Sequence, residues 1–188
     1  MSAGPAGRAG PSDRAAWPGS AGSAARLVAV LRDGGLTLGV AESLTGGAVS
    51  AAVVAVPGAS RVLRGSVTAY DVEVKSDVLG VDPAVVEEHG VVSAPVAIAM
   101  ARGAAQVLRA DVAVATTGVA GPGPSDGVPA GRVVVAAVAG DVVAVRRVLL
   151  GGGRALVRAA AVELALGLAL EVVDEVASGG RDGNTTRP

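Results

Sequence analysis

Hydrophobic positions along the chain follow two different spacings. Apolar residues that recur every three or four positions predict helices at 24–33, 71–79, 94–108 and 154–173. A further helix of small residues is expected between residues 42–47 and Pro57. Short runs that alternate or are wholly apolar predict strands at 36–41, 61–70, 110–118, 132–140 and 141–150. Helix and strand therefore alternate over most of the chain.

The order of these elements indicates the fold class. Strands are separated by helices in the first part of the chain, whereas Gly140 and Asp141 join the last two strands in the manner of a hairpin. Hydrophobic residues make up 51% of the sequence and include no phenylalanine, so the core must consist of small and branched aliphatic side chains. We expect an α/β fold, a three-layer α/β/α sandwich with a mixed, mostly parallel sheet.

Composition changes at both ends of the chain. Residues 1–23 are rich in Gly, Ala, Pro and Ser and lack a continuous apolar stretch, which predicts a disordered tail and not a signal peptide. Residues 178–188 are polar and are expected to form a second disordered tail, which leaves one domain at 24–177. No apolar run is long enough to cross a bilayer. We therefore expect a cytoplasmic protein without membrane contacts.

Charge and residue counts exclude several classes of function. The formal net charge is -1, and arginines and acidic residues are interspersed, so no basic face for nucleic acid is predicted. The chain has no cysteine and a single histidine, His89, which excludes thiolate catalysis and leaves little for a zinc site. We expect no metal and no cofactor, and we expect His89 to end a helix without a catalytic role.

The stretch TAYDVEVKSD, at 68–77, holds the only tyrosine, Tyr70, and the only lysine, Lys75, at a predicted strand-to-helix junction. A lysine whose pKa falls from ~10.4 to roughly 7–8 can accept the proton of a serine hydroxyl, which arginine cannot do. The alternative is a surface lysine beside a core tyrosine whose hydroxyl is satisfied. Residue counts alone leave both interpretations open.

A nucleophile that such a lysine could activate occurs in ESLTGG, at 42–47. Ser43 follows a predicted strand, and Gly46 and Gly47 would let a substrate approach the backbone at a helix N-terminus, which suits an anion or a developing oxyanion. The plainer alternative is that Ser43 or Thr45 only caps the helix.

Two further segments could bind a ligand. The sequence TTGVAGPG places Thr117, Gly118 and Gly121 where a strand runs into a loop, although it matches neither a Walker A loop nor a dinucleotide fingerprint. In GGGRALVR, Arg154 and Arg158 lie one helical turn apart and could clamp a phosphate. A plain turn and a solvated helix face are the respective alternatives.

Six motifs taken in order point to a known family. AESLTGG, VPGAS, YDVEVKSDVLGV, HGVVSAPVAIAMARGA, TTGVAGP and GGGRALVR resemble the CinA C-terminal domain family, the nicotinamide-nucleotide amidohydrolases. The resemblance covers about residues 24–173. Larger CinA proteins also carry an N-terminal molybdopterin-binding-like domain, which this sequence lacks, so it resembles the stand-alone form.

The resemblance implies a three-layer fold and the conversion of nicotinamide mononucleotide to nicotinate mononucleotide and ammonia, in pyridine-nucleotide recycling. It implies that Ser43 is the nucleophile, that Lys75 and Tyr70 assist it, and that no metal takes part. From residue type and position we expect a second group to bind the substrate: Thr45, Gly46, Gly47, Thr117, Gly118, Gly121 and Arg154. A nucleotide is the expected partner, and we expect a homo-oligomer, namely a dimer.

The sequence also departs from the family pattern. Val72 stands where the family often has Asn, Gly153 stands where it has Asp, and GPSDGVPAG replaces a glycine-richer loop. A non-catalytic nucleotide-binding or competence- and damage-related module, or an amidase for another small carboxamide, therefore remain alternatives. Under the amidohydrolase hypothesis Lys75 should be buried, lie within hydrogen-bond reach of Ser43 or Tyr70, and not be replaceable by arginine.

Overall fold

A computed structural model describes residues 20–179, in which five strands form one sheet in the order β2-β1-β3-β4-β5. The strands are β1 (Leu38–Glu42), β2 (Leu63–Thr68), β3 (Val112–Gly118), β4 (Arg132–Ala139) and β5 (Val142–Leu149). β1 pairs in parallel with β2 and β3, whereas β4 pairs antiparallel with β3 and β5. The sheet is mixed as expected, but only two of its four strand pairs are parallel, because the β4–β5 hairpin adds antiparallel pairs.

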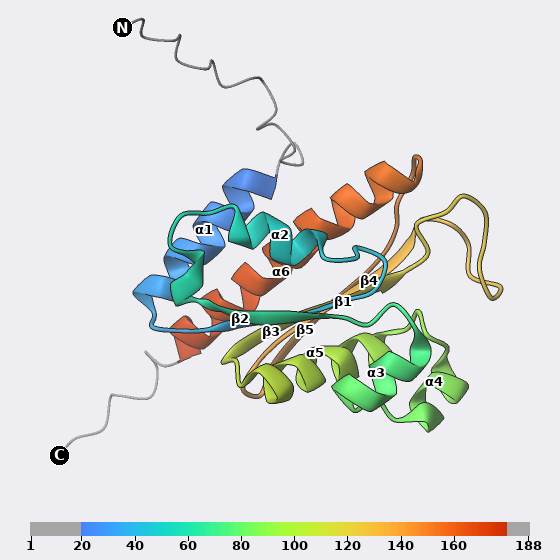
Figure 1. Cartoon of the computed structure of the whole chain (residues 1–188), viewed down its shortest axis with the longest axis horizontal. Helices are drawn as coiled ribbons and strands as arrows, with labels where there is room; N and C mark the ends of the chain where they lie inside the picture. The colour runs from blue at the N-terminus through green and yellow to red at the C-terminus, as the bar shows by residue number, and fades with distance from the viewer. Residues whose placement is uncertain (1–19, 180–188) are drawn as a thin grey trace, which may run out of the picture.

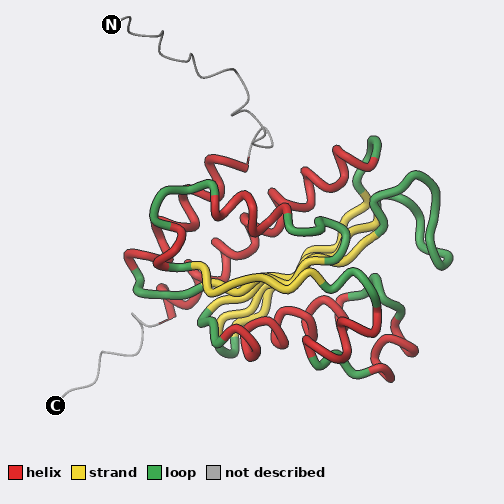
Figure 2. The backbone as a smooth tube through the Cα atoms, in the orientation of Figure 1, coloured by secondary structure: helices red, strands yellow, loops and turns green. Residues whose placement is uncertain are grey.

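Helices cover both faces of this sheet (Figures 1 and 2). On one face lie α1 (Ser20–Asp33), α2 (Ala48–Val54) and α6 (Arg154–Gly179). On the other lie α3 (Val72–Leu79), α4 (Pro83–His89) and α5 (Ala94–Leu108). Because both faces are covered, β1 and β3 are buried along their length and read as nearly continuous apolar runs.

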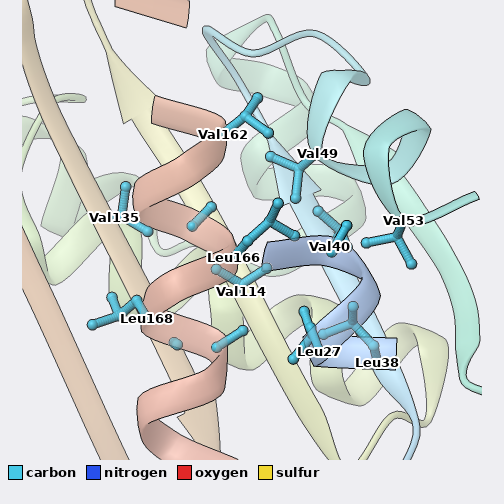
Figure 3. Packing of buried hydrophobic residues seen from close by; sticks show 14 of the residues in the cluster. Leu27, Leu38, Val40, Val49, Val53, Val114, Val135, Val162, Leu166 and Leu168 are labelled. Atoms are coloured by element: carbon cyan, nitrogen blue, oxygen red, sulfur yellow. The ribbon is translucent and has the colours of Figure 1, made fainter. Parts of the chain in front are cut away.

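The core is built from small and branched side chains, as the composition predicts. Figure 3 shows Leu166 and Leu168 of α6 packed near Val114 and Val135 of the sheet, with Leu27 of α1 alongside. A second cluster under α5 consists largely of alanine and valine around Met100. Side chains of this size let helices approach the sheet closely without an aromatic residue in either cluster.

Element boundaries differ from the expectations in a few places. α1 begins at Ser20, inside the stretch expected to be a tail, and α6 continues to Gly179. The short 3-10 helix η1 (Ala59–Arg61) has too few turns for a periodic pattern and was not predicted, and of α4 only its end at His89 was expected. The remaining parts of the expected tails, 1–19 and 180–188, lie outside the described residues. Within 20–179 no helix has both the length and the apolar character that crossing a bilayer requires.

The sheet topology brings several loops to one edge. β1 lies between β2 and β3 and all three run in the same direction, so their carboxyl ends meet. β4 runs the opposite way, which returns the β3–β4 loop to that edge, where it projects beyond the sheet (Figure 1). Ligands of α/β sheets commonly bind outside the carboxyl ends of such strands, where the chain turns to opposite faces.

Candidate active site

A cavity of about 440 Å³ opens at this edge of the sheet. Seven of the ten predicted site residues line it: Ser43, Tyr70, Lys75, Thr117, Gly118, Gly121 and Arg154. They come from the ends of β1, β2 and β3, from α3, from the β3–β4 loop and from the start of α6. The remaining three, Thr45, Gly46 and Gly47, do not line the cavity.

Ser43 directly follows β1 and is nearly buried, with 8% of its surface exposed. Its N–H donates to the carbonyl of Thr116 at 3.0 Å, which extends the pairing of β1 with β3. The N–H of Gly46 donates to the Ser43 carbonyl at 3.1 Å and closes a tight turn. Gly46 has φ 59°, a left-handed conformation that glycine adopts without strain. Ser43 is therefore presented by a turn at the end of a buried strand.

Neither Ser43 nor Thr45 caps α2, so the plainer of the two interpretations of this motif is wrong. The N-cap is Gly47, and the capping group is the buried carboxylate of Glu42. Its oxygens accept from the N–H groups of Gly47, Val49 and Ser50 at 2.9–3.0 Å and from the Ser50 hydroxyl at 2.8 Å. The start of α2 is thus already occupied by an anion of the protein itself.

Sequence reasoning missed Glu42, although a signal for it exists. It is the one charged residue in a strand that is otherwise wholly apolar, and a buried charge requires several partners. Because its carboxylate fills the helix N-terminus, Gly46 and Gly47 shape the turn and leave no open anion site there.

A buried contact between two threonines and two partly buried hydrogen bonds from Arg158 hold the turn from its other side. The hydroxyls of Thr45 and Thr116 are hydrogen-bonded at 2.7 Å, which uses the Thr45 side chain inside the protein. Arg158 donates from Nε to the Leu44 carbonyl at 3.1 Å and from Nη2 to the Thr45 carbonyl at 2.6 Å. Arg158 therefore faces the turn, and a solvated helix face is excluded for it.

Lys75 is fully buried, as the amidohydrolase hypothesis predicts. Its Nζ donates to the carbonyl of Ala69 at 2.7 Å and contacts those of Tyr70 and Asp71 at 3.3 Å each. Burial lowers the pKa of Lys75 below its ordinary value, and the nearby Asp71 carboxylate opposes that shift only in part. The uncharged amine is thus favoured more than in an exposed lysine.

Lys75 was expected to lie within hydrogen-bond reach of Ser43 or Tyr70, and of these two it contacts Tyr70 alone. Its contact with Tyr70 is to the main-chain carbonyl, and within residues 20–179 no hydrogen bond joins it to the hydroxyl of Ser43 or of Tyr70. A neutral amine has two N–H donors and one lone pair, so three carbonyl acceptors suit the charged form better. Accepting a proton from Ser43 requires Lys75 to release one of its two longer contacts.

Tyr70 lies at the rim of the cavity and not in the core, since 63% of its surface is exposed. Its hydroxyl accepts a hydrogen bond from Arg154 Nη2 at 3.1 Å, and Arg154 Nη1 donates to the Gly121 carbonyl at 2.9 Å. The β2–α3 junction, the β3–β4 loop and the start of α6 are thereby joined at the mouth of the cavity.

The end of β3 forms another wall of the cavity. The Thr117 hydroxyl donates to the Val91 carbonyl at 3.0 Å, which links β3 to the segment before α5. A Cβ at Gly118 would lie 2.6 Å from the Arg132 carbonyl, so no larger residue fits without a backbone shift. Beyond Gly121, the tip of the β3–β4 loop brings Asp126 to the cavity.

The described residues contain no group of three or more His, Cys, Asp or Glu side chains that could hold a metal ion. His89 is the last residue of α4, as expected for a helix end, and its Nε2 lies 3.6 Å from a carboxylate oxygen of Glu88. It does not line the cavity.

Comparison with known proteins identifies the family. The chain is 48% identical over 133 residues to a CinA-like protein of Gemmatimonas aurantiaca, and the aligned region covers 70% of this chain and 31% of that protein. It is 42% identical over 153 residues to a CinA-like protein of Mycobacterium marinum, and the aligned region covers 80% of this chain and 35% of that protein. The chain thus spans about a third of the length of these curated relatives.

A solved structure with a similar fold has nearly the same length as the matched region. The competence/damage-inducible protein of Agrobacterium tumefaciens superposes with a TM-score of 0.79 at 35% identity, over 82% of this chain and 96% of the other. The family model described as the CinA C-terminal domain matches residues 21–173, which include every predicted site residue. The protein belongs to the CinA C-terminal domain family.

Proposed function

We propose that this protein hydrolyses the carboxamide of nicotinamide mononucleotide, giving nicotinate mononucleotide and ammonia. The observation that carries the proposal is that Ser43 and the buried Lys75, whose pKa is lowered by desolvation, line the same cavity. A serine hydroxyl beside a lysine that can be neutral is a known route to an activated nucleophile. Membership of the CinA C-terminal domain family supports the same assignment.

The chemistry requires two half-reactions. Ser43 Oγ attacks the carboxamide carbon and its proton passes to the neutral Lys75 amine, while the carbonyl π electrons move to the oxygen. Collapse of this tetrahedral intermediate breaks the C–N bond, and the amide nitrogen takes the proton from Lys75 and leaves as ammonia. Water, deprotonated by the same lysine, then attacks the acyl-enzyme ester and restores the Ser43 hydroxyl.

The rim of the cavity supplies the groups for the rest of the nucleotide. Arg154 is a cation that Tyr70 and the Gly121 carbonyl hold in place, so we assign it to the phosphate. Because the Tyr70 hydroxyl is bonded to Arg154, we assign Tyr70 to substrate positioning. Thr117 and Gly118 form the wall against which the pyridine ring would lie.

A second candidate substrate class is favoured by the charges at the rim. Besides Lys75, the charged residues that line the cavity are Arg154 and Asp126, so one carboxylate offsets the only arginine. A dianionic phosphate gains less from such a lining than from one with several cations. An uncharged small carboxamide, cleaved by the same Ser43 and Lys75, is therefore the alternative.

The decisive experiment measures ammonia release from nicotinamide mononucleotide, and in parallel from nicotinamide and its riboside. Activity of the wild-type protein should be lost in Ser43→Ala, and Lys75→Arg should lose it almost as completely because a guanidinium does not deprotonate. Arg146→Lys, at an exposed residue of β5 that pairs with Glu171 of α6, serves as a matched control and should keep full activity.

The outcomes separate the candidates. Release from the mononucleotide alone supports the leading proposal, and faster release from the two amides that lack the phosphate supports the second. If folded protein releases no ammonia from saturating concentrations of the mononucleotide, of nicotinamide or of its riboside, neither amidase proposal holds. Full activity of Lys75→Arg would show that Lys75 is not the base, while the assignment of Ser43 as the nucleophile would stand.

A further inference from the structure

The turn that follows β1 leaves two main-chain N–H groups without a protein acceptor. The Ser43 N–H is bonded to Thr116, and the Gly46 N–H is bonded to the Ser43 carbonyl. No acceptor for the N–H of Leu44 or of Thr45 occurs among the described residues. Of these two, Leu44 lines the cavity beside Ser43 and Thr45 does not. An N–H beside the nucleophile, with no internal partner, requires an explanation.

The hydrogen bonds of the turn fix the direction of the Leu44 N–H. The N–H of a trans peptide points opposite to the carbonyl of the preceding residue. The Ser43 carbonyl points into the turn, toward the Gly46 N–H at 3.1 Å, so the Leu44 N–H points out of it. It lies on the peptide unit next to the Ser43 side chain, which is where serine hydrolases place a donor for the developing oxyanion.

Arg158 is connected to this donor through two peptide units. Its Nη2 donates to the Thr45 carbonyl at 2.6 Å, and the same peptide unit carries the Gly46 N–H. That N–H donates to the Ser43 carbonyl, whose peptide unit carries the Leu44 N–H. A cation at one end of such a chain polarises each bond in turn and makes the last N–H a stronger donor. The second contact of Arg158, to the Leu44 carbonyl, fixes the middle of the turn.

We propose that the Leu44 N–H is an oxyanion donor and that Arg158 is the positioning residue that orients and polarises it through the Thr45 and Ser43 carbonyls. The inference rests on the proposed role of Ser43 as a nucleophile. It assigns to Arg158 a part in the chemical step, exerted from the side of the turn away from substrate. Glu42, which fixes the opposite end of the turn by capping α2, completes the support.

The test compares a tetrahedral analogue with a ground-state ligand. Pyridine-3-boronic acid carries boron where nicotinamide has its carboxamide carbon. Bonding to Ser43 Oγ makes the boron tetrahedral and negatively charged, as the hydroxyl proton passes to Lys75. ¹¹B NMR distinguishes this adduct from the free trigonal acid, and calorimetry gives the affinity of the boronate and of nicotinamide for each variant.

Arg158→Lys should lose about 10-fold or more of the boronate affinity while nicotinamide affinity changes by less than about twofold, because only the adduct bears charge on the oxyanion position. The same variant should lose kcat with little change in KM. Arg146→Lys should leave both affinities unchanged. Replacing Leu44 by its α-hydroxy acid removes that N–H, makes the Ser43 carbonyl a weaker acceptor for the Gly46 N–H, and should cost about 10²–10³ in kcat.

Equal changes of the two affinities in Arg158→Lys, or an active ester variant at Leu44, would overturn the inference. So would the absence of a tetrahedral boron signal with the wild-type protein. The ester variant keeps Arg158 in place, so it tests the donor even if the lysine variant folds poorly. A tetrahedral adduct without ammonia release from nicotinamide mononucleotide would leave the inference standing and remove the proposed substrate, so the two failures are distinguishable.

Discussion

Lys75 contacts three carbonyl oxygens, and none of the ion pairs among residues 20–179 includes it. Its burial lowers the pKa, and the Asp71 carboxylate raises it by a smaller amount. A lysine in this setting therefore loses its proton at a lower pH than an exposed lysine does. The two contacts of 3.3 Å are long for hydrogen bonds, and they are the ones we expect the neutral amine to exchange.

The lowered pKa of Lys75 should be directly measurable. Because the chain has one lysine, protein labelled with [¹³Cε]lysine gives one NMR signal that needs no assignment. We expect its titration midpoint to lie below the ordinary lysine value. If Lys75 is the base, kcat/KM should rise with pH through the same midpoint, because only the neutral amine accepts the Ser43 proton.

Stability provides the control for this pKa shift. Between the folded and the unfolded pKa of Lys75 the unfolded chain binds more protons, so this residue makes the free energy of unfolding increase with pH in that window. The difference between the wild-type protein and Lys75→Met, from urea titrations at several pH values, should show this slope. An NMR midpoint at the ordinary lysine value, with no slope, would contradict the shift.

At the scale of elements, a glycine determines how α3 lies on α5. A Cβ at Gly103, in the middle of α5, would lie only 1.9 Å from the carbonyl oxygen of Leu79 at the end of α3. Lys75 is one turn earlier in α3. The close approach of the two helices therefore helps to place the lysine beside the cavity. Gly167, within α6, offers a matched comparison, because a Cβ at that position would meet no atom within 4 Å.

Gly103→Ala should destabilise the protein by about 1–3 kcal/mol, because the added methyl group forces the end of α3 away from α5. Gly167→Ala should stabilise it by about 1 kcal/mol, since alanine is the better helix former and nothing obstructs it. Urea unfolding measures both. Activity should fall in Gly103→Ala alone, through displacement of Lys75. Equal free energies of unfolding for the two variants would contradict the packing argument.

Most elements could be predicted from the sequence because their boundaries have local causes. Ser93 caps α5 through the Val96 N–H, and Gly80 ends α3 in a left-handed conformation, both as the sequence indicates. The capping of α2 could not be predicted by the same rule. Ser43 and Thr45 were the expected caps, but the carboxylate of Glu42 accepts hydrogen bonds from three N–H groups at the start of α2 instead.

At the scale of the whole molecule, the site forms where the carboxyl ends of three parallel strands meet. Ser43, Tyr70 and Thr117 follow or end three adjacent strands that point the same way, and this brings them together at one edge of the sheet. The sequence predicted that they share one site, but it did not predict the order of the strands. The exclusion of Thr45 from the cavity depends on its contacts with Thr116 and Arg158. These partners are distant in sequence, and no local pattern specifies them.

A ligand that bridges these segments should stabilise the whole fold. Ser43→Ala should bind nicotinamide mononucleotide without consuming it. At a ligand concentration of about 100 Kd the gain is about 2.7 kcal/mol, which corresponds to a rise in Tm of about 5–10 °C for a protein of this size. Adenosine monophosphate, which has the phosphate and ribose but no carboxamide, serves as the comparison in thermal unfolding. An equal rise with both would indicate that the cavity does not select the pyridine ring.

The burial of Lys75 also allows local and global unfolding to be measured by chemical labelling. The entire chain carries one ε-amine, and the fold covers it completely. An amine-acylating reagent that is too bulky for the cavity can therefore reach that nitrogen only during excursions in which α3 leaves α5 or the whole molecule unfolds. The mass increase at this one position, followed over hours, would count those excursions under native conditions, without denaturant or a fluorescent label.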